Sequence, residues 1–278
     1  MRVGLFAAAL LAMLVGYHVL FLHHAPEVFS NVQEDMSHGW CVPVFSLYLV
    51  WHERRKIVES VGEPSLVGLL LLVPFAFAGF LGVRGAQIRL EIVGFVGTLI
   101  GLVWTVFGAR TMRQTLFPSL YLLFCLPFHT YLDVITIHFR MLSVAIANAI
   151  FQVCHVDVVR EGTMLLSPTG SFSIDVAEPC SGMRSLFAMM ALTAGYAYFT
   201  QPTWGRRGLL LVCSIPIAVI GNVSRILSIV LVAATCSPDF ATGFCHDYSG
   251  YVVFGVAVFL MVAADGLITK GMEQCARS

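Results

Sequence analysis

The sequence has unusually little charge. Charged residues make up only 12% of the 278 residues, about half the share of a typical soluble domain. The 16 basic and 16 acidic residues cancel, so nothing in the net charge attracts nucleic acid. Hydrophobic residues reach 58%, with a mean hydropathy of +0.85. A soluble chain of this length could not bury so many apolar side chains, so we expect one integral membrane domain over 1–278.

The sequence also lacks the motifs of common metal sites and soluble enzymes. None of the eight cysteines forms a CxxC pair, which argues against a structural zinc site. There is no HExxH, GxSxG, Walker A or dinucleotide-binding pattern. The adjacent pair His23 and His24 is weak evidence for a metal site. We therefore expect neither a metal ion nor a cofactor.

Long apolar runs are abundant, and a membrane-spanning helix needs about 20 mostly apolar residues. Eight segments qualify as candidates: 3–22, 39–52, 65–83, 92–109, 115–132, 183–200, 208–235 and 249–268. The first is expected to be a retained helix, because no clear small-x-small cleavage site follows it; a cleaved signal peptide is the alternative. The second is short and contains Pro43. The predicted fold is an all-α polytopic membrane protein with about eight transmembrane helices.

A long segment, 133–182, separates the fifth and sixth candidates. Its apolar stretch 134–151 is interrupted by His138, Arg140 and Asn148, which indicates a helix in the membrane interface or tucked against the bundle. Residues 156–177 resemble short strands separated by turns. This small β element is expected outside the hydrocarbon, because open strands cannot satisfy their backbone groups in lipid.

Basic loops set the expected orientation, since cytoplasmic loops are rich in lysine and arginine. The basic residues that define the cytoplasmic side are Arg54, Arg55, Lys56, Arg110, Arg113, Arg206, Arg207, Lys270 and Arg277. This orientation puts both termini in the cytoplasm and 133–182 outside, although Arg84 and Arg89 oppose it. A ninth crossing at 134–151 would move Arg206 and Arg207 outside, so we favour eight.

Three polar sites carry candidate chemistry, and the first is Glu178–Arg184 (EPCSGMR) at the start of the sixth segment. Pro179 favours a break just before the helix, which would place Cys180 near the helix N-terminus. Free N–H groups and the positive end of the helix dipole favour a thiolate there. Arg184 would add positive charge one turn later. The alternative is a small buried cysteine beside a helix cap.

The second site is Asn222–Arg225 (NVSR), inside the seventh segment. An arginine at the centre of a spanning helix costs at least about 2.5–3.5 kcal/mol on insertion scales. Arg225 comes 17 residues after Gly208, a rise of about 25 Å that would bring it near the outer edge of the hydrocarbon. Its side chain could simply reach the outer surface, but Asn222 on the same helical face favours a polar site. The glycosylation pattern of Asn222 conflicts with burial in a helix.

The third site is His246, just before the eighth segment. Alone, a loop histidine is usually a solvated bystander. However, the three sites belong to consecutive helices and fall at the same bilayer face. A cysteine, an arginine and a histidine form a sensible chemical set, because the histidine moves protons while the arginine stabilises a thiolate or an oxyanion.

At these residues the chain resembles the exosortase/archaeosortase family of membrane cysteine transpeptidases of the PEP-CTERM type. The matching blocks are Cys180–Arg184 (CSGMR), Asn222–Arg225 and His246, with upstream likeness at Ser37–Gly39 and Phe117–Pro127. The resemblance implies that Cys180 is the nucleophile, Arg225 its thiolate or oxyanion partner, and His246 the acid and base. The substrate-binding or supporting residues it implies are Glu178, Ser181, Gly182, Arg184, Asn222 and His38.

The resemblance also implies a partner and a location. The substrates would be exported proteins with a C-terminal sorting tail, made of a short motif such as Pro-Glu-Pro, a membrane helix and a basic cluster. The enzyme would lie in the bacterial cytoplasmic (inner) membrane, cleave near the motif on the outer face and transfer the chain to an acceptor. Pro179 and Gly221 depart from the pattern of relatives, which leaves the subfamily and the substrate motif open.

Cys236 and Cys245 bracket the outer loop before His246. In an oxidising compartment they could form a disulfide that closes a loop of about ten residues and positions the histidine. Two other functions remain alternatives. A transporter would use Asn222 and Arg225 to line a pathway, but no inverted repeat supports it. A non-catalytic assembly factor of the cell envelope or of exopolysaccharide synthesis would keep the fold without turnover.

Overall fold

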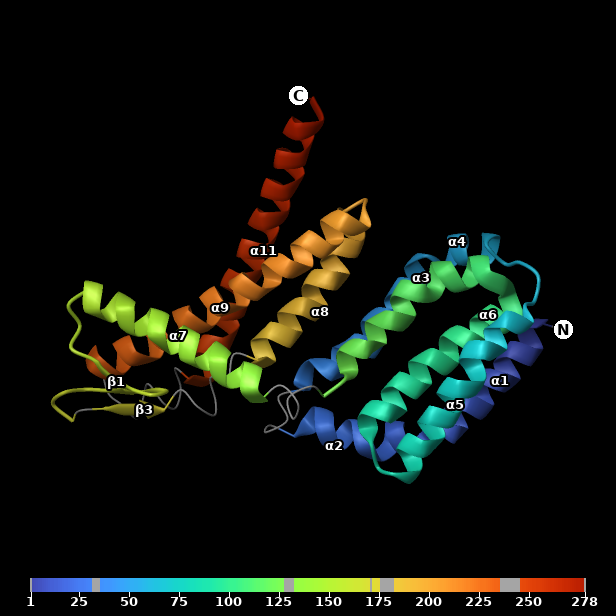
Figure 1. Cartoon of the computed structure of the whole chain (residues 1–278), viewed down its shortest axis with the longest axis horizontal. Coiled ribbons are helices and arrows are strands. Elements are labelled where there is room, and N and C mark those ends of the chain that lie inside the picture. The colour runs from blue at the N-terminus through green and yellow to red at the C-terminus, as the bar shows by residue number, and fades with distance from the viewer. Residues whose placement is uncertain are drawn as a thin grey trace. The chain divides into compact units, whose positions relative to one another are not determined.

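The computed structural model describes residues 2–31, 36–127, 133–170, 172–175, 183–235 and 246–277, and these residues are mostly helical with one small sheet. The chain divides into two compact units, Met1–Phe128 and His129–Ser278 (Figure 1). Each unit has its own helix packing. The expectation of one membrane domain over the whole chain stays a prediction.

Every helix or strand that the structure describes in the first unit is a helix. Its elements are α1 (Arg2–Gly16), the π-helix η1 (Leu20–His24), α2 (Ala25–Ser30), the 3-10 helix η3 (Ser37–Trp40), α3 (Cys41–His52), α4 (Arg54–Glu59), the 3-10 helix η4 (Leu66–Gly68), α5 (Leu69–Arg84), α6 (Ile88–Tyr121) and the 3-10 helix η5 (Leu122–Cys125).

Gly108 divides the long helix α6 into two parts. Its φ of +85° is non-helical and belongs to the region that favours glycine. A Cβ at this position would also lie 2.5 Å from the carbonyl oxygen of Glu63. The chain changes direction here (Figure 1). Residues 88–107 rise about 30 Å, which is one hydrocarbon thickness. The first part corresponds to the expected segment 92–109. The second part, continued by η5 to Cys125, covers only the beginning of the expected segment 115–132, and residues 128–132 lie outside the described residues.

Glycines bring α5 and α6 into backbone contact. A Cβ built on Gly94 would lie 2.5 Å from the Cα of Gly79 and 2.9 Å from the carbonyl oxygen of Phe75. A Cβ on Gly101 would lie 2.5 Å from the main-chain nitrogen of Leu72. Small residues allow this close approach, which is the usual way for membrane helices to gain packing contacts. The hairpin therefore depends on glycine at positions far apart in the sequence.

Replacing Gly94 with alanine is expected to lower the free energy of unfolding by about 1–3 kcal/mol, because the added methyl group has no room between two backbones. Thermal unfolding in detergent micelles measures the effect. Gly4→Ala is the matched control, since Gly4 is also helical but a Cβ there would meet nothing within 4 Å. Equal melting temperatures for the two variants would contradict this account of the α5–α6 contact.

A buried ion pair joins the first helices to α6. The axes of Arg2–Gly16 and Leu20–Ser30 differ by 57°. The π-helix η1 at this bend ends with His24, whose Nδ1 lies 2.7 Å from Oε1 of Glu91. The Glu91 side chain has no exposed surface. A carboxylate is held in such a place by pairing, so this contact links the bent first segment to α6.

Within its described residues, the second unit contains four long helices and the small sheet. Its elements are α7 (Asp133–Val153), β1 (Val159–Glu161), β2 (Met164–Leu166), β3 (Ser173–Asp175), α8 (Met183–Thr200), α9 (Trp204–Thr235) and α11 (His246–Arg277). The strands are antiparallel in the order β1-β2-β3. Gly162 (φ +63°) and Gly170 (φ +73°) lie in the turns between them. The structure confirms the small β element expected in 156–177.

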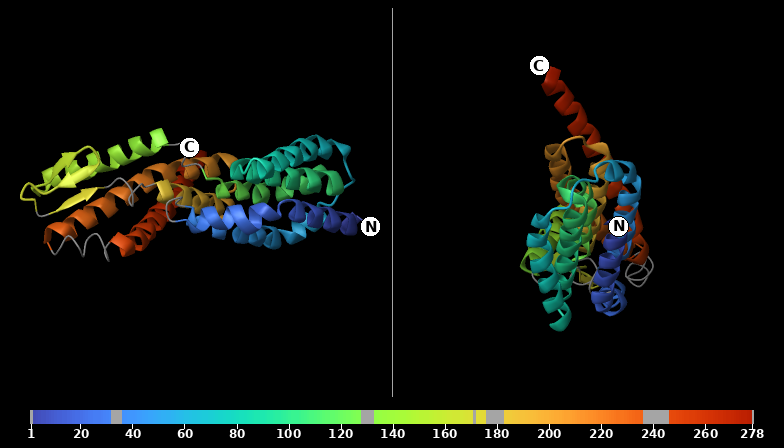
Figure 2. Two further views of the ribbon diagram at one scale, coloured as in Figure 1. Left: turned by 90° about the horizontal axis from the view of Figure 1, so that it is seen from below. Right: turned by 90° about the vertical axis from the view of Figure 1, so that its right-hand side faces the viewer.

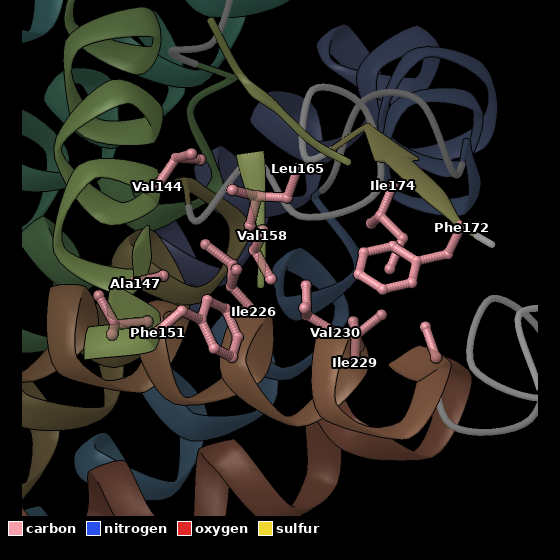
Figure 3. Close-up of a cluster of buried hydrophobic side chains, with 12 residues drawn as sticks. Val144, Ala147, Phe151, Val158, Leu165, Phe172, Ile174, Ile226, Ile229 and Val230 are labelled. Atoms are coloured by element: carbon pink, nitrogen blue, oxygen red, sulfur yellow. The ribbon is translucent and has the colours of Figure 1, made fainter. Parts of the chain in front are cut away.

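Helix α9 is central in the second unit. Along its second half it packs against α7 and the sheet, and the shared core includes Val144, Phe151, Leu165, Ile226 and Val230 (Figure 3). The sheet lies beside the second half of α7 (Figures 1 and 2). The expected helix within 134–151 is therefore tucked against a helical bundle. Whether it also lies in the membrane interface stays a prediction.

The long apolar helices support the prediction that this chain is a membrane protein. Among the described residues, four helices are long and apolar enough to cross a bilayer, or five if the bent first pair counts as one span. The candidate Ile88–Cys125 has 38 residues, a rise of about 57 Å and nearly twice the hydrocarbon thickness. Its division at Gly108 fits two crossings. The full count of eight stays a prediction.

Candidate functional site

The second half of α9 carries a buried amide. The Asn222 side chain is only 2% exposed, and its Nδ2 has no hydrogen-bond partner among the residues that the structure describes. Leaving a buried donor unpaired costs about 1–3 kcal/mol. Arg225 follows three residues later and is half-buried. Packing of the described helices does not explain why an amide occupies this position.

The first turn of α8 lies close to Asn222. Leu186 clusters with Ala218 of α9, one helical turn before Asn222, and Met189 clusters with Ile217. Since α8 and α9 are antiparallel, the start of α8 at Met183 lies about 5 Å further along the bundle than Leu186, near the level of Asn222. Arg184 belongs to this first turn. Glu178, Cys180, Ser181 and Gly182 precede it and lie outside the described residues.

The first turn of α11 lies at a similar level. Ala257 and Met261 cluster with Ile217, and α11 begins at His246, eleven residues before Ala257. Those eleven residues rise about 16 Å, which corresponds on the antiparallel helix α9 to a level about one turn beyond Arg225. The helix register thus places the starts of α8 and α11 and the pair Asn222–Arg225 within about two turns of one another along the bundle.

A polar network fixes this register from the other end of the same helices. Asp265 of α11 accepts hydrogen bonds from Tyr196 Oη (3.1 Å), from Thr200 Oγ1 (3.4 Å) and from Gln201 Nε2. Arg207 Nε donates to the main-chain oxygen of Gln201 (2.9 Å). The network joins α8, α9 and α11. Sequence analysis missed it, although the only acidic residue inside the apolar run 249–268 was a usable signal.

His38 belongs to the first unit, in η3. The neighbouring Gly39 allows this turn to pack against Phe29, because a Cβ there would lie 2.7 Å from the Phe29 ring. The main-chain oxygen of Gly39 accepts a hydrogen bond from Cys125 Sγ at 3.7 Å. The structure therefore anchors the turn that carries His38. A role for His38 in the site rests on the family resemblance alone.

Two further expectations concern sulfur and metal chemistry. The pair Cys236 and Cys245 lies outside the described residues, so the disulfide stays a prediction. Within the described ranges, no group of three or more histidine, cysteine, aspartate or glutamate side chains could hold a metal ion.

A family comparison covers most of the chain. A model described as transmembrane exosortase (Exosortase_EpsH) matches residues 30–263. The chain belongs to the transmembrane exosortase family. The match includes Cys180, Arg225 and His246, and it confirms the family indicated by the three motifs. Searches of curated proteins and of solved structures found no match.

Proposed function

We propose that this exosortase is a membrane-embedded cysteine transpeptidase that cleaves C-terminal sorting tails of exported proteins and transfers them to an acceptor. The observation that carries the proposal is the register of α8, α9 and α11. Within a chain that belongs to the exosortase family, it brings the segment ends that bear the three motifs to one end of the bundle.

The proposed reaction has two halves. The Cys180 thiolate attacks the carbonyl carbon of the scissile peptide, and Arg225 stabilises the negative charge on the oxygen. His246 gives a proton to the leaving amine, the C–N bond breaks and a thioester remains on Cys180. An acceptor nucleophile then attacks the thioester, His246 takes the acceptor's proton, and the thiolate leaves.

The proposed location is the outer face of the bacterial inner membrane. Arg206 and Arg207 lie at the start of α9, at the end opposite the candidate site. The Arg207 guanidinium lies over the rings of Tyr198 (4.9 Å) and Trp204 (5.2 Å). Aromatic and basic residues of this kind are typical of the cytoplasmic membrane boundary. The site at the other end would then face outward, where exported proteins arrive.

The proposed substrate is the one that the family resemblance implies, and the position of the site at the end of a membrane bundle is compatible with it. A peptide bond at that depth is reachable when a membrane helix of the substrate holds it against the outer surface. A tail with a short motif, a spanning helix and a basic cytoplasmic cluster meets this requirement. The sequence of the substrate motif and the chemical identity of the acceptor have to be determined by an assay.

Reconstitution tests the proposed function. The full chain in lipid vesicles, mixed with a protein that ends in a sorting tail of the Pro-Glu-Pro type, is expected to release the tail and to carry a thioester on Cys180. Peptide mass spectrometry after acid quenching would detect this adduct, and hydroxylamine should remove it. Tail release with no adduct on Cys180 would contradict a cysteine mechanism, and no release at all would favour the assembly role.

A further inference from the structure

The side-chain amide of Asn222 has no role in the proposed reaction so far. Its side chain is 2% exposed, and Nδ2 is buried without a hydrogen-bond partner among the described residues. Helices in a membrane commonly use asparagine to make hydrogen bonds between helices. The described neighbours supply no such bond here, so this donor is available to a group outside the described residues.

The hydroxyl of helix α7 that lies nearest the level of Asn222 belongs to Ser143, and it donates a hydrogen bond within its own helix. Helix α7 runs parallel to α9, because Phe139 clusters with Ala218 while Val144 and Phe151 cluster with later residues of α9. By this register Ser143 faces the level of Asn222. Its Oγ donates to the main-chain oxygen of Phe139 at 2.9 Å, within its own helix. A hydroxyl that donates can still accept, but Asn222 Nδ2 makes no hydrogen bond to Ser143 or to any other described residue.

The surroundings of Asn222 strengthen any hydrogen bond that it makes. Val223 and Ile226, which follow it on α9, are 6% and 1% exposed and belong to the apolar core. Ala218, one turn earlier, is 1% exposed and packs with Leu186 of α8. In such a low-dielectric setting a donor stabilises a developing negative charge more strongly than it would in water.

A second set of donors lies at the same level. The first main-chain N–H groups of α8 have no partner within their own helix, and they begin at Met183, near the level of Asn222. A helix N-terminus and a buried carboxamide are both used to bind oxyanions in acyl-transfer sites. Here the two come from adjacent helices next to the segment that carries Cys180.

We propose that Asn222 is a catalytic residue whose Nδ2 donates a hydrogen bond to the carbonyl oxygen of the scissile peptide, together with the N-terminus of α8. This inference rests on the proposed function. Asn222 would stabilise the oxyanion that forms when the thiolate attacks and again when the thioester is resolved. In this assignment Arg225 shares the stabilisation of the oxyanion or holds the thiolate beside it.

The test compares Asn222→Leu and Asn222→Asp with the unaltered chain in vesicles. Both variants keep the approximate shape and remove the donor. The rate of thioester formation in a single turnover is expected to fall about 100-fold to 1,000-fold, as for other oxyanion donors, while KM changes less than about threefold because the interaction strengthens only in the transition state. Ser228→Ala is the control, since the Ser228 hydroxyl donates to Ser224 of its own helix at 2.8 Å.

A peptide aldehyde separates this role from a structural one. It forms a tetrahedral adduct with a cysteine, whereas the matching alcohol only binds. The Asn222 variants should bind the aldehyde much more weakly and the alcohol unchanged, with no loss of melting temperature. Thioester formation within threefold of normal, or equal losses of aldehyde and alcohol binding, would overturn the inference. If Cys180→Ala still cleaves the tail, the proposed function fails instead, whatever the Asn222 variants do.

Discussion

Cleavage of the sorting tail is expected to fall at least about 10⁴-fold when Cys180 is replaced by alanine, because removal of a covalent nucleophile leaves only binding and charge stabilisation. The thioester adduct should disappear completely. Cys180→Ser should restore little of the rate, since a hydroxyl is far less ionised than a thiol at neutral pH. Unprocessed substrate accumulating in the membrane would be the corresponding result in cells.

Cys213→Ala is the matched control for this variant. Cys213 lies on α9, nine residues before Asn222. It packs beside the cluster of Met189, Ile217, Ala257 and Met261 and not at the candidate site. Its replacement should leave cleavage within about threefold of normal. Normal processing of the tail in cells that carry only Cys180→Ala would reject Cys180 as the nucleophile and support a non-catalytic assembly role for this chain.

Arg225→Gln is expected to lower the rate of thioester formation about 100-fold to 1,000-fold, the size of effect seen when one charged or polar stabiliser is removed from an acyl-transfer site. Glutamine retains much of the side-chain shape and can still donate hydrogen bonds, so the loss would report the positive charge. Arg225→Lys should recover only part of the rate, because an ammonium group does not reproduce the planar fork of a guanidinium. Single-turnover kinetics in vesicles measures both.

Arg160→Gln controls for the loss of a positive charge elsewhere in the same unit. Arg160 lies on β1, and its Nε donates to the main-chain oxygen of Gly162 at 2.9 Å in an exposed setting. Its replacement should leave the rate unchanged. If Arg225→Gln cleaves as fast as Arg160→Gln, Arg225 has no role in the chemistry, and its charge simply reaches the outer surface.

The family and several elements could be predicted from local sequence. The sixth segment, 183–200, matches α8 at both ends. The strands of 156–177 formed where glycine turns separate short apolar runs. The first part of α6, up to Gly108, was also expected as a helix within 92–109. These predictions succeeded because the signals, which are apolar length, turn residues and motif spacing, act over a few neighbouring positions.

Contacts between residues that are far apart in the sequence could not be predicted from the sequence. The glycine contact between α5 and α6 joins Gly79 to Gly94, and neither glycine identifies the other in the sequence. The same holds for His24 with Glu91 and for Asp265 with Gln201. In each case a polar or small residue within an apolar run indicates that the helix has a contact at that position. The residue that makes the contact is known only from the packing of the folded chain.

By itself, the sequence determined that this chain is a membrane protein and that it carries the exosortase motifs, because composition and short motifs are properties of the covalent chain. The tertiary structure alone decided that Asn222 Nδ2 is buried without a hydrogen-bond partner among the described residues. It also decided that the first turns of α8 and α11 lie near the level of Asn222. The physical reason is helix register. It depends on how the apolar faces of α7, α8, α9 and α11 interlock and on the polar network at Asp265, which locks the far end of three of them.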